Sequence, residues 1–157
     1  MTHPTTITAA PGLPFVDIVR EFDAPVAAVF RAHTEPELFA RWTGPRGQVI
    51  EIGEFDATMG GRWQYTTRAR EGGQVYGFRG VFHTVESDAL IIQTFEFDGA
   101  PGLVAIGTMT FAAVGRRTRI SGREVHPSVE ARDAAVASGM EYGVNEGYER
   151  LDELLAN

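Results

Sequence analysis

The stretch from Phe22 to Gly61 constrains the fold more than any other part of the sequence. β-Branched and aromatic residues over 15–22 predict a strand, which ends at Asp23-Ala24-Pro25. Apolar residues at helical spacing then predict one short helix after Pro25 and a second over 35–42. A glycine pair, Gly60-Gly61, opens a run of further strands. Any fold for this chain must therefore accommodate one strand, two short helices and then a sheet.

Alternating residues and glycine-rich turns predict an antiparallel meander beyond the short helices. Gly77 and Gly80 fall inside one of its strands and indicate bulges or bends. With the first strand, the meander gives a sheet of six or seven strands. Its expected strands cover residues 48–54, 61–70, 75–86, 89–97, 103–113 and 118–125.

A single long helix is expected over residues 129–155, where apolar side chains recur every three or four residues. Gly139, Gly143 and Gly147 recur at every fourth position of the same segment. Each glycine inside a helix costs about 1 kcal/mol relative to alanine, so the series needs a reason. Close packing of the helix on the sheet is the reason we expect, and room for a ligand is the alternative.

These features resemble the AHSA1-like branch (activator of Hsp90 ATPase homologue) of the START/Bet v 1 (SRPBCC) superfamily. The likeness rests on the run FDAPVAAVFRAHTEPELFARWTGP, on Met59–Trp63 and on the closing segment 138–155. It implies an α+β, helix-grip fold, in which a curved antiparallel sheet surrounds a long C-terminal helix. We expect a single domain over residues 15–157, after a flexible tail over residues 1–14.

Several chemistries are excluded by what the sequence lacks. It has no Cys and no Lys, which removes thiol nucleophiles, Cys-metal sites and Schiff-base chemistry. Its net charge of −7 argues against nucleic-acid binding. The His residues lack metal-binding spacing, and His33 closes the first short helix, where a cation suits the helix dipole. We therefore assign no catalytic residue and no metal ligand, and we expect no cofactor.

Aromatic and apolar side chains are the remaining candidates for a site. They suit either a solid core or the wall of a pocket, and the family resemblance favours a cavity between sheet and helix. Polar pocket candidates are Arg62, Arg119 and Tyr142. The apolar candidates are Trp42, Trp63, Tyr65, Phe78, Phe82, Phe95, Phe97, Met109, Phe111, Met140, Val144 and Tyr148.

Three functions fit this sequence. The first is binding of a small hydrophobic or amphipathic molecule such as a lipid, a polyketide or an aromatic metabolite. The second is an enzyme similar to the aromatase/cyclases of the superfamily, although no acid/base pair stands out. The third, an Hsp90 co-chaperone, is not expected, because only 14 residues precede the first strand, whereas the eukaryotic activators carry a separate N-terminal domain.

The sequence also gives expectations about setting and assembly. It contains no apolar run long enough to span a membrane, and residues 1–14 lack the features of a secretory signal, so we expect a cytoplasmic protein. A homodimer through the outer sheet face or the two short helices is compatible with the sequence.

Overall fold

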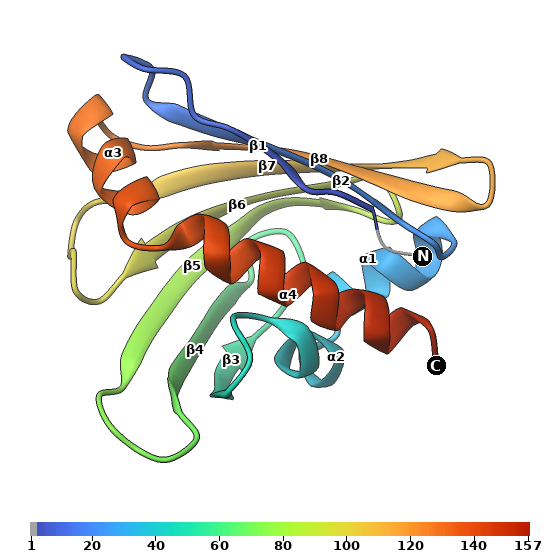
Figure 1. Ribbon diagram of the computed structural model, residues 1–157, viewed down its shortest axis with the longest axis horizontal. Helices are drawn as coiled ribbons and strands as arrows, with labels where there is room; N and C mark the ends of the chain where they lie inside the picture. The colour runs from blue at the N-terminus through green and yellow to red at the C-terminus, as the bar shows by residue number, and fades with distance from the viewer. Residues whose placement is uncertain (1–2) are drawn as a thin grey trace.

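The computed structural model, described here for residues 3–157, is an antiparallel sheet that curves around one helix (Figure 1). The sheet has eight strands in the order β1-β2-β8-β7-β6-β5-β4-β3. This is the α+β, helix-grip arrangement that the sequence predicts, with a slightly larger strand count. The strands are β1 (Thr6–Thr8), β2 (Phe15–Phe22), β3 (Gln48–Phe55), β4 (Arg62–Ala69), β5 (Tyr76–Glu86), β6 (Leu90–Phe97), β7 (Ala105–Val114) and β8 (Arg117–Val125).

The extra strand is β1, and for residues 6–8 it corrects the prediction of a flexible tail over residues 1–14, of which residues 1 and 2 lie outside the described part of the chain. Thr6, Ile7 and Thr8 pair with β2, so this part of the chain is held by the sheet. β2 itself pairs with β8 rather than with β3, because α1 and α2 carry the chain across the concave face. The meander therefore runs from β3 to β8, and the first two strands extend it at the far edge.

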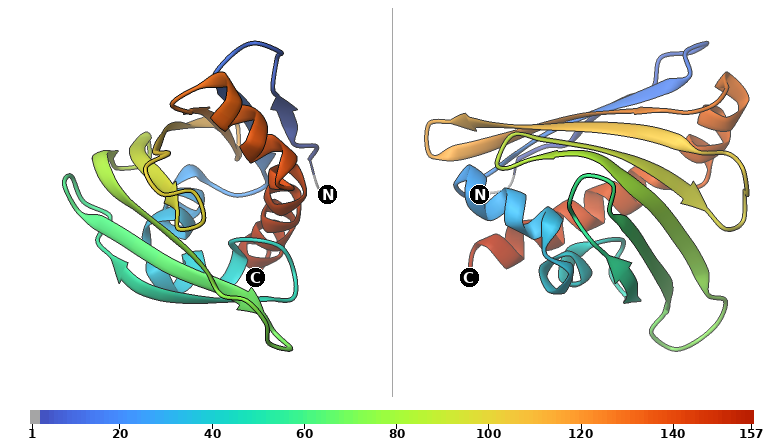
Figure 2. Two further views of the ribbon diagram at one scale, coloured as in Figure 1. Left: turned by 90° about the vertical axis from the view of Figure 1, so that its left-hand side faces the viewer. Right: turned by 180° about the vertical axis from the view of Figure 1, so that it is seen from behind.

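The four helices lie on the concave side of the sheet, as the views in Figure 2 show. The expected helix over residues 129–155 is in fact two, because Gly139 adopts a positive φ of 95° that breaks it. A side chain at this φ would be strained, which explains the glycine. The helices are α1 (Val26–Thr34), α2 (Pro36–Trp42), α3 (Val129–Ala137) and α4 (Met140–Leu155).

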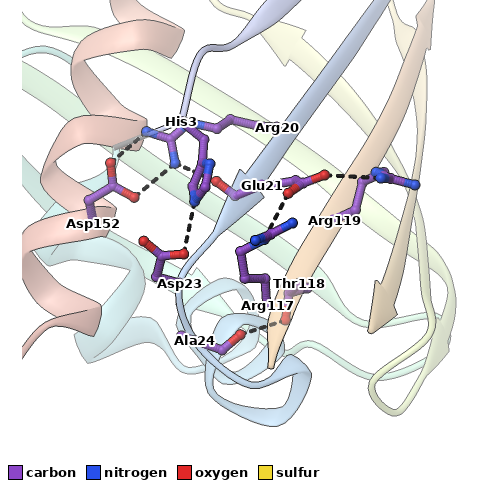
Figure 3. A network of polar contacts seen from close by, with 9 residues as sticks. All are labelled: His3, Arg20, Glu21, Asp23, Ala24, Arg117, Thr118, Arg119 and Asp152. Carbon is purple, nitrogen blue, oxygen red and sulfur yellow. Dashed lines mark hydrogen bonds and ion pairs between the residues drawn. The ribbon is translucent and has the colours of Figure 1, made fainter. Parts of the chain in front are cut away.

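A buried ion pair attaches α4 to the sheet (Figure 3). Arg20 on β2 is 2% exposed, and its guanidinium donates two hydrogen bonds to the carboxylate of Asp152 at 2.8 and 2.5 Å. The neighbouring Glu21 points to the other face of the sheet and pairs with Arg117 and Arg119 at 3.0 Å each. A charge on the inner face of β2 is thus neutralised by the helix that covers it.

Two groups of glycines differ from their predicted roles. The strand register is regular at Gly77 and Gly80, and the irregularities lie between Ile52 and Glu54 and between Phe82 and Thr84. At Gly80, a Cβ would overlap the carbonyl oxygen of Thr94 and the Trp63 indole, so close approach is the reason for this glycine.

The helical glycines do not pack against the sheet as predicted. A Cβ at Gly147 would lie 3.4 Å from both the amide nitrogen of Gly44 and the carbonyl oxygen of Trp42. At Gly143 the nearest atom would be Cδ of Pro45 at 3.9 Å. The helix α4 therefore approaches the loop after α2 most closely, and this contact holds α2 over the concave face.

Candidate functional site

A cavity of about 190 Å³ lies on the concave side of the sheet. Its floor comes from β2, β6, β7 and β8, and its cover comes from α1, α2 and α4. Most of the exposed area inside is apolar, as is typical of small-molecule sites. The lining residues are Ile18, His33, Phe39, Trp42, Ile91, Gln93, Phe95, Gly107, Thr108, Met109, Gly122, Arg123, Glu124 and Tyr148.

Two strand glycines create the space. Gly107 on β7 and Gly122 on β8 occupy the inward positions next to Met109 and Ile120, whose side chains pack in the interior. A Cβ at Gly122 would meet only neighbouring backbone oxygens, at 3.7 and 3.8 Å, and a Cβ at Gly107 would meet one at 3.9 Å. Neither glycine is needed for a tight contact or a positive φ. Their missing side chains therefore account for part of the cavity volume.

The predicted apolar residues divide into two groups. Trp42, Phe95, Met109 and Tyr148 line the cavity. Most of the others pack against one another and fill the interior beside it. This group comprises Trp63, Tyr65, Phe82 and Phe111, which are buried, and Phe78 and Val144, which pack against them. Phe97 stacks on Phe78 at a centroid distance of 5.2 Å, and Met140 begins α4, so neither reaches the lining.

The three polar pocket candidates lie outside the cavity, which corrects that prediction. The side chain of Arg62 is 70% exposed and lies 3.4 Å from Glu54 on the outer face. Arg119 also faces outward and pairs with Glu21. Tyr142 is 64% exposed on α4, where its hydroxyl lies 3.2 Å from Glu146. Strand alternation explains both arginines, because the adjacent Trp63 and Ile120 take the inward positions.

His33 is the most unusual polar group of the lining. It is 7% exposed, and its ring contacts Trp42 and Phe111 at centroid distances of 4.9 and 5.3 Å. Nδ1 donates a hydrogen bond to the carbonyl oxygen of Val29 at 2.8 Å, so the neutral ring carries a lone pair on Nε2. Within residues 3–157, Nε2 has no hydrogen-bond partner.

Burial also decides the charge of His33. It lowers the pKa of His33 to about 4, and the bond to Val29 opposes this only in part. The imidazole is therefore neutral at pH 7. This corrects the expectation of a cation at the end of α1, because desolvation outweighs the helix dipole here.

Glu124 brings a carboxylate to the same cavity. On β8 it occupies the inward position two residues after Gly122, opposite Gly107 on β7 and the fully buried Val16 on β2. Its side chain is 31% exposed, and Oε1 lies 3.1 Å from Nε2 of His126. Its charge acts on the interior, because it adds to the effect of burial in raising the pKa of Tyr65.

Sequence reasoning missed His33, Gln93, Glu124 and both strand glycines. A signal existed for the strand residues. Thr118 and Ile120 are inward positions on β8, and alternation extends that face to Gly122 and Glu124. His33 had no such signal, since its burial depends on α2 folding back over α1 so that Trp42 lies against its ring.

Other features of the described chain bear on the kind of site. Among residues 3–157, no three His, Asp or Glu side chains gather into a group that could hold a metal ion. Over the same residues, no helix combines the length and the apolar character needed to cross a membrane. Within these residues, the candidate site is an apolar cavity with His33, Gln93 and Glu124 among its polar lining residues.

Comparisons with known proteins agree with the fold. The family model described as "Activator of Hsp90 ATPase homolog 1-like protein" matches residues 23–156. A Rhodobacter sphaeroides protein has 27% identity and a TM-score of 0.86, with 96% of this chain and 99% of that one covered. A Mycobacterium smegmatis protein, Ms6760, has 21% identity and a TM-score of 0.87, with 97% of each chain covered. None of the curated proteins compared with this chain matches it.

A third solved structure carries the family's own name. The AHSA1 protein of Silicibacter pomeroyi has 22% identity and a TM-score of 0.72, with 90% of this chain and 97% of that one covered. At 21–22% identity, the Mycobacterium and Silicibacter structures show the shared fold alone.

Proposed function

We propose that this chain, which belongs to the family of activator of Hsp90 ATPase homologue 1-like proteins, binds a small hydrophobic or amphipathic molecule in its cavity. The observation that carries the proposal is the apolar cavity of about 190 Å³ between the sheet and the helices. Small-molecule sites are usually concave and mostly apolar, with a few polar groups, and this cavity has that character.

The size of the cavity limits the ligand. An apolar cavity of about 150 Å³ engineered into another protein accepts benzene, so this one suits a molecule of one or two rings. Trp42, Phe39, Phe95 and Tyr148 supply aromatic surface to such a ring. An aromatic metabolite therefore fits better than a lipid or an extended polyketide chain.

The polar groups favour binding over catalysis of the aromatase/cyclase kind. General acids and bases work best when their pKa lies near the working pH. Here burial lowers the pKa of His33 to about 4 and raises the pKa of Tyr148 to about 12. Both groups therefore stay neutral near pH 7, where they can orient a ligand by hydrogen bonds.

Titration calorimetry with indole tests the proposal, because indole is a neutral two-ring molecule. We expect saturable binding with one site per chain and a rise in melting temperature. Gly122→Val is the matched control, because the valine side chain would occupy the cavity without a positive φ or a close contact at Cβ. Binding of indole that Gly122→Val leaves unchanged would place the ligand elsewhere, and no binding of indole, benzene or naphthalene would contradict the proposal.

A further inference from the structure

We propose that the cavity selects aromatic molecules that carry a protonated amine, with the ring in the apolar lining and the ammonium group at Glu124. This inference rests on the proposed function and names the class of ligand for the same site. It depends on which polar groups face the cavity, on their charge, and on which of them already have partners.

The first step is the position of Glu124. Its carboxylate shares the inward face of β8 with Thr118 and Ile120, both of which are buried. Gly107 lies directly opposite on β7, so the position that faces Glu124 on that strand has no side chain. Among residues 3–157, Glu124 makes no side-chain hydrogen bond, and its Oε1 lies 3.1 Å from Nε2 of the His126 ring. The carboxylate can therefore accept a hydrogen bond from a ligand.

The second step is the lack of an available basic side chain. Arg123 borders the cavity, but its guanidinium donates to both carboxylate oxygens of Asp17, at 2.7 and 2.9 Å. It also lies over the Phe15 ring, 3.8 Å from the centroid. The charge of Arg123 is therefore balanced by Asp17. The carboxylate of Glu124, in contrast, has only the His126 ring next to it.

The third step is the character of the other polar and aromatic groups. His33 offers a lone pair at Nε2 and no proton there, so it can accept but not donate at that atom. Trp42, Phe39 and Tyr148 add aromatic surface to the lining, and the face of an aromatic ring attracts cations when water is excluded. A ligand with N–H groups and a positive charge satisfies this set, and a carboxylate ligand meets repulsion from Glu124.

Three indole compounds of similar size test how the charge of the ligand changes its affinity while its ring stays the same. Calorimetry compares tryptamine, which is cationic, with neutral indole and with anionic indole-3-propionate. We expect tryptamine to bind at least about tenfold more tightly than indole-3-propionate, a difference of about 1.4 kcal/mol. Added sodium chloride should weaken tryptamine binding and leave indole binding nearly unchanged.

Glu124→Gln keeps the size of the side chain and removes its charge, so it should abolish the preference for tryptamine while indole still binds. Glu51→Gln is the matched control, because Glu51 is 65% exposed on β3 and lies 3.7 Å from Arg68. Equal affinities of tryptamine and indole-3-propionate, or a preference that survives in Glu124→Gln, would overturn the inference alone. Failure of all three compounds to bind would instead contradict the proposed function.

Discussion

The two halves of the concave face follow the same strand alternation, but their inward positions carry different residues. On β4 and β5, inward positions carry Trp63, Tyr65 and Phe78, and these rings pack against one another and against Phe95. On β7 and β8, glycines take two inward positions, and the cavity lies there. The aromatic half therefore fills its space, whereas the glycine half leaves it open. In this fold an aromatic cluster marks the packed core, and the missing side chains mark the site.

The largest expected effect on stability concerns the aromatic half of the concave face. Phe82 is 1% exposed within the aromatic cluster, and Phe82→Ala should lower the free energy of unfolding by about 3–5 kcal/mol. Met109→Ala, at the cavity edge, is the comparison and should cost less, because its side chain borders space on one side. Urea unfolding measures both, and equal losses would remove the distinction between the two halves.

The second prediction concerns His33, the buried histidine in the cavity lining. The folded-state pKa of His33 is about 4, below its ordinary value of 6.5, so the unfolded chain binds more protons between these values. Stability from this group is complete above pH 6.5 and is lost as pH falls towards 4. The loss is on the order of 3 kcal/mol. Chemical denaturation across this range should show a smaller loss in His33→Gln than in the natural chain, and identical slopes would contradict a buried neutral His33.

A pair of glycine substitutions tests the two halves with the same chemical change. Gly80→Ala places a methyl group against Thr94 and Trp63 in the aromatic half, and it should destabilise the protein by about 1–3 kcal/mol. Thermal melts followed by near-ultraviolet circular dichroism would detect both the loss and any shift of the Trp63 ring. A melting temperature equal to that of the natural chain would show that the close approach at Gly80 is relaxed in solution.

Gly122→Ala is the matching change in the glycine half, and it has the smallest expected effect. Its Cβ meets nothing closer than 3.7 Å, and alanine restricts the unfolded chain. We therefore expect a gain of about 0.4–1 kcal/mol. A marked loss of stability in the same thermal melts would show that the space beside Gly122 is filled.

The sequence predicts the fold better than the site, and particular residues show why. Local patterns locate β2, α1 and α2, because strand and helix periodicity depend on neighbours in the chain. Strand pairing does not follow from local pattern, so the place of β2 beside β8 and the pairing of β1 were missed. Gly139 is itself a sign of the break between α3 and α4. The apolar stripe on both sides of it, however, predicts one continuous helix.

The site residues depend on packing between distant segments. The sequence leaves open whether the aromatic side chains form a solid core or a pocket wall, because whether a ring lines a void depends on its neighbours across the sheet. Trp63 packs over Gly80, and Met109 lies opposite Gly122 beside open space. Arg62 and Arg119 are pocket candidates in the sequence, but alternation with Trp63 and Ile120 assigns both to the outer face. A glycine at an inward strand position is the signal that finds this cavity.

The most direct test of the central claim is a map of backbone amide chemical shifts on titration with indole. Ring currents from a ligand bound in the cavity should move the amide signals of Gly107, Gly122 and Glu124, and leave those of Gly72 and Gly73, in the turn after β4, in place. That result would locate the ligand at the glycine half of the concave face. Shifts confined to the outer face of the sheet, or none at saturating indole, would contradict it.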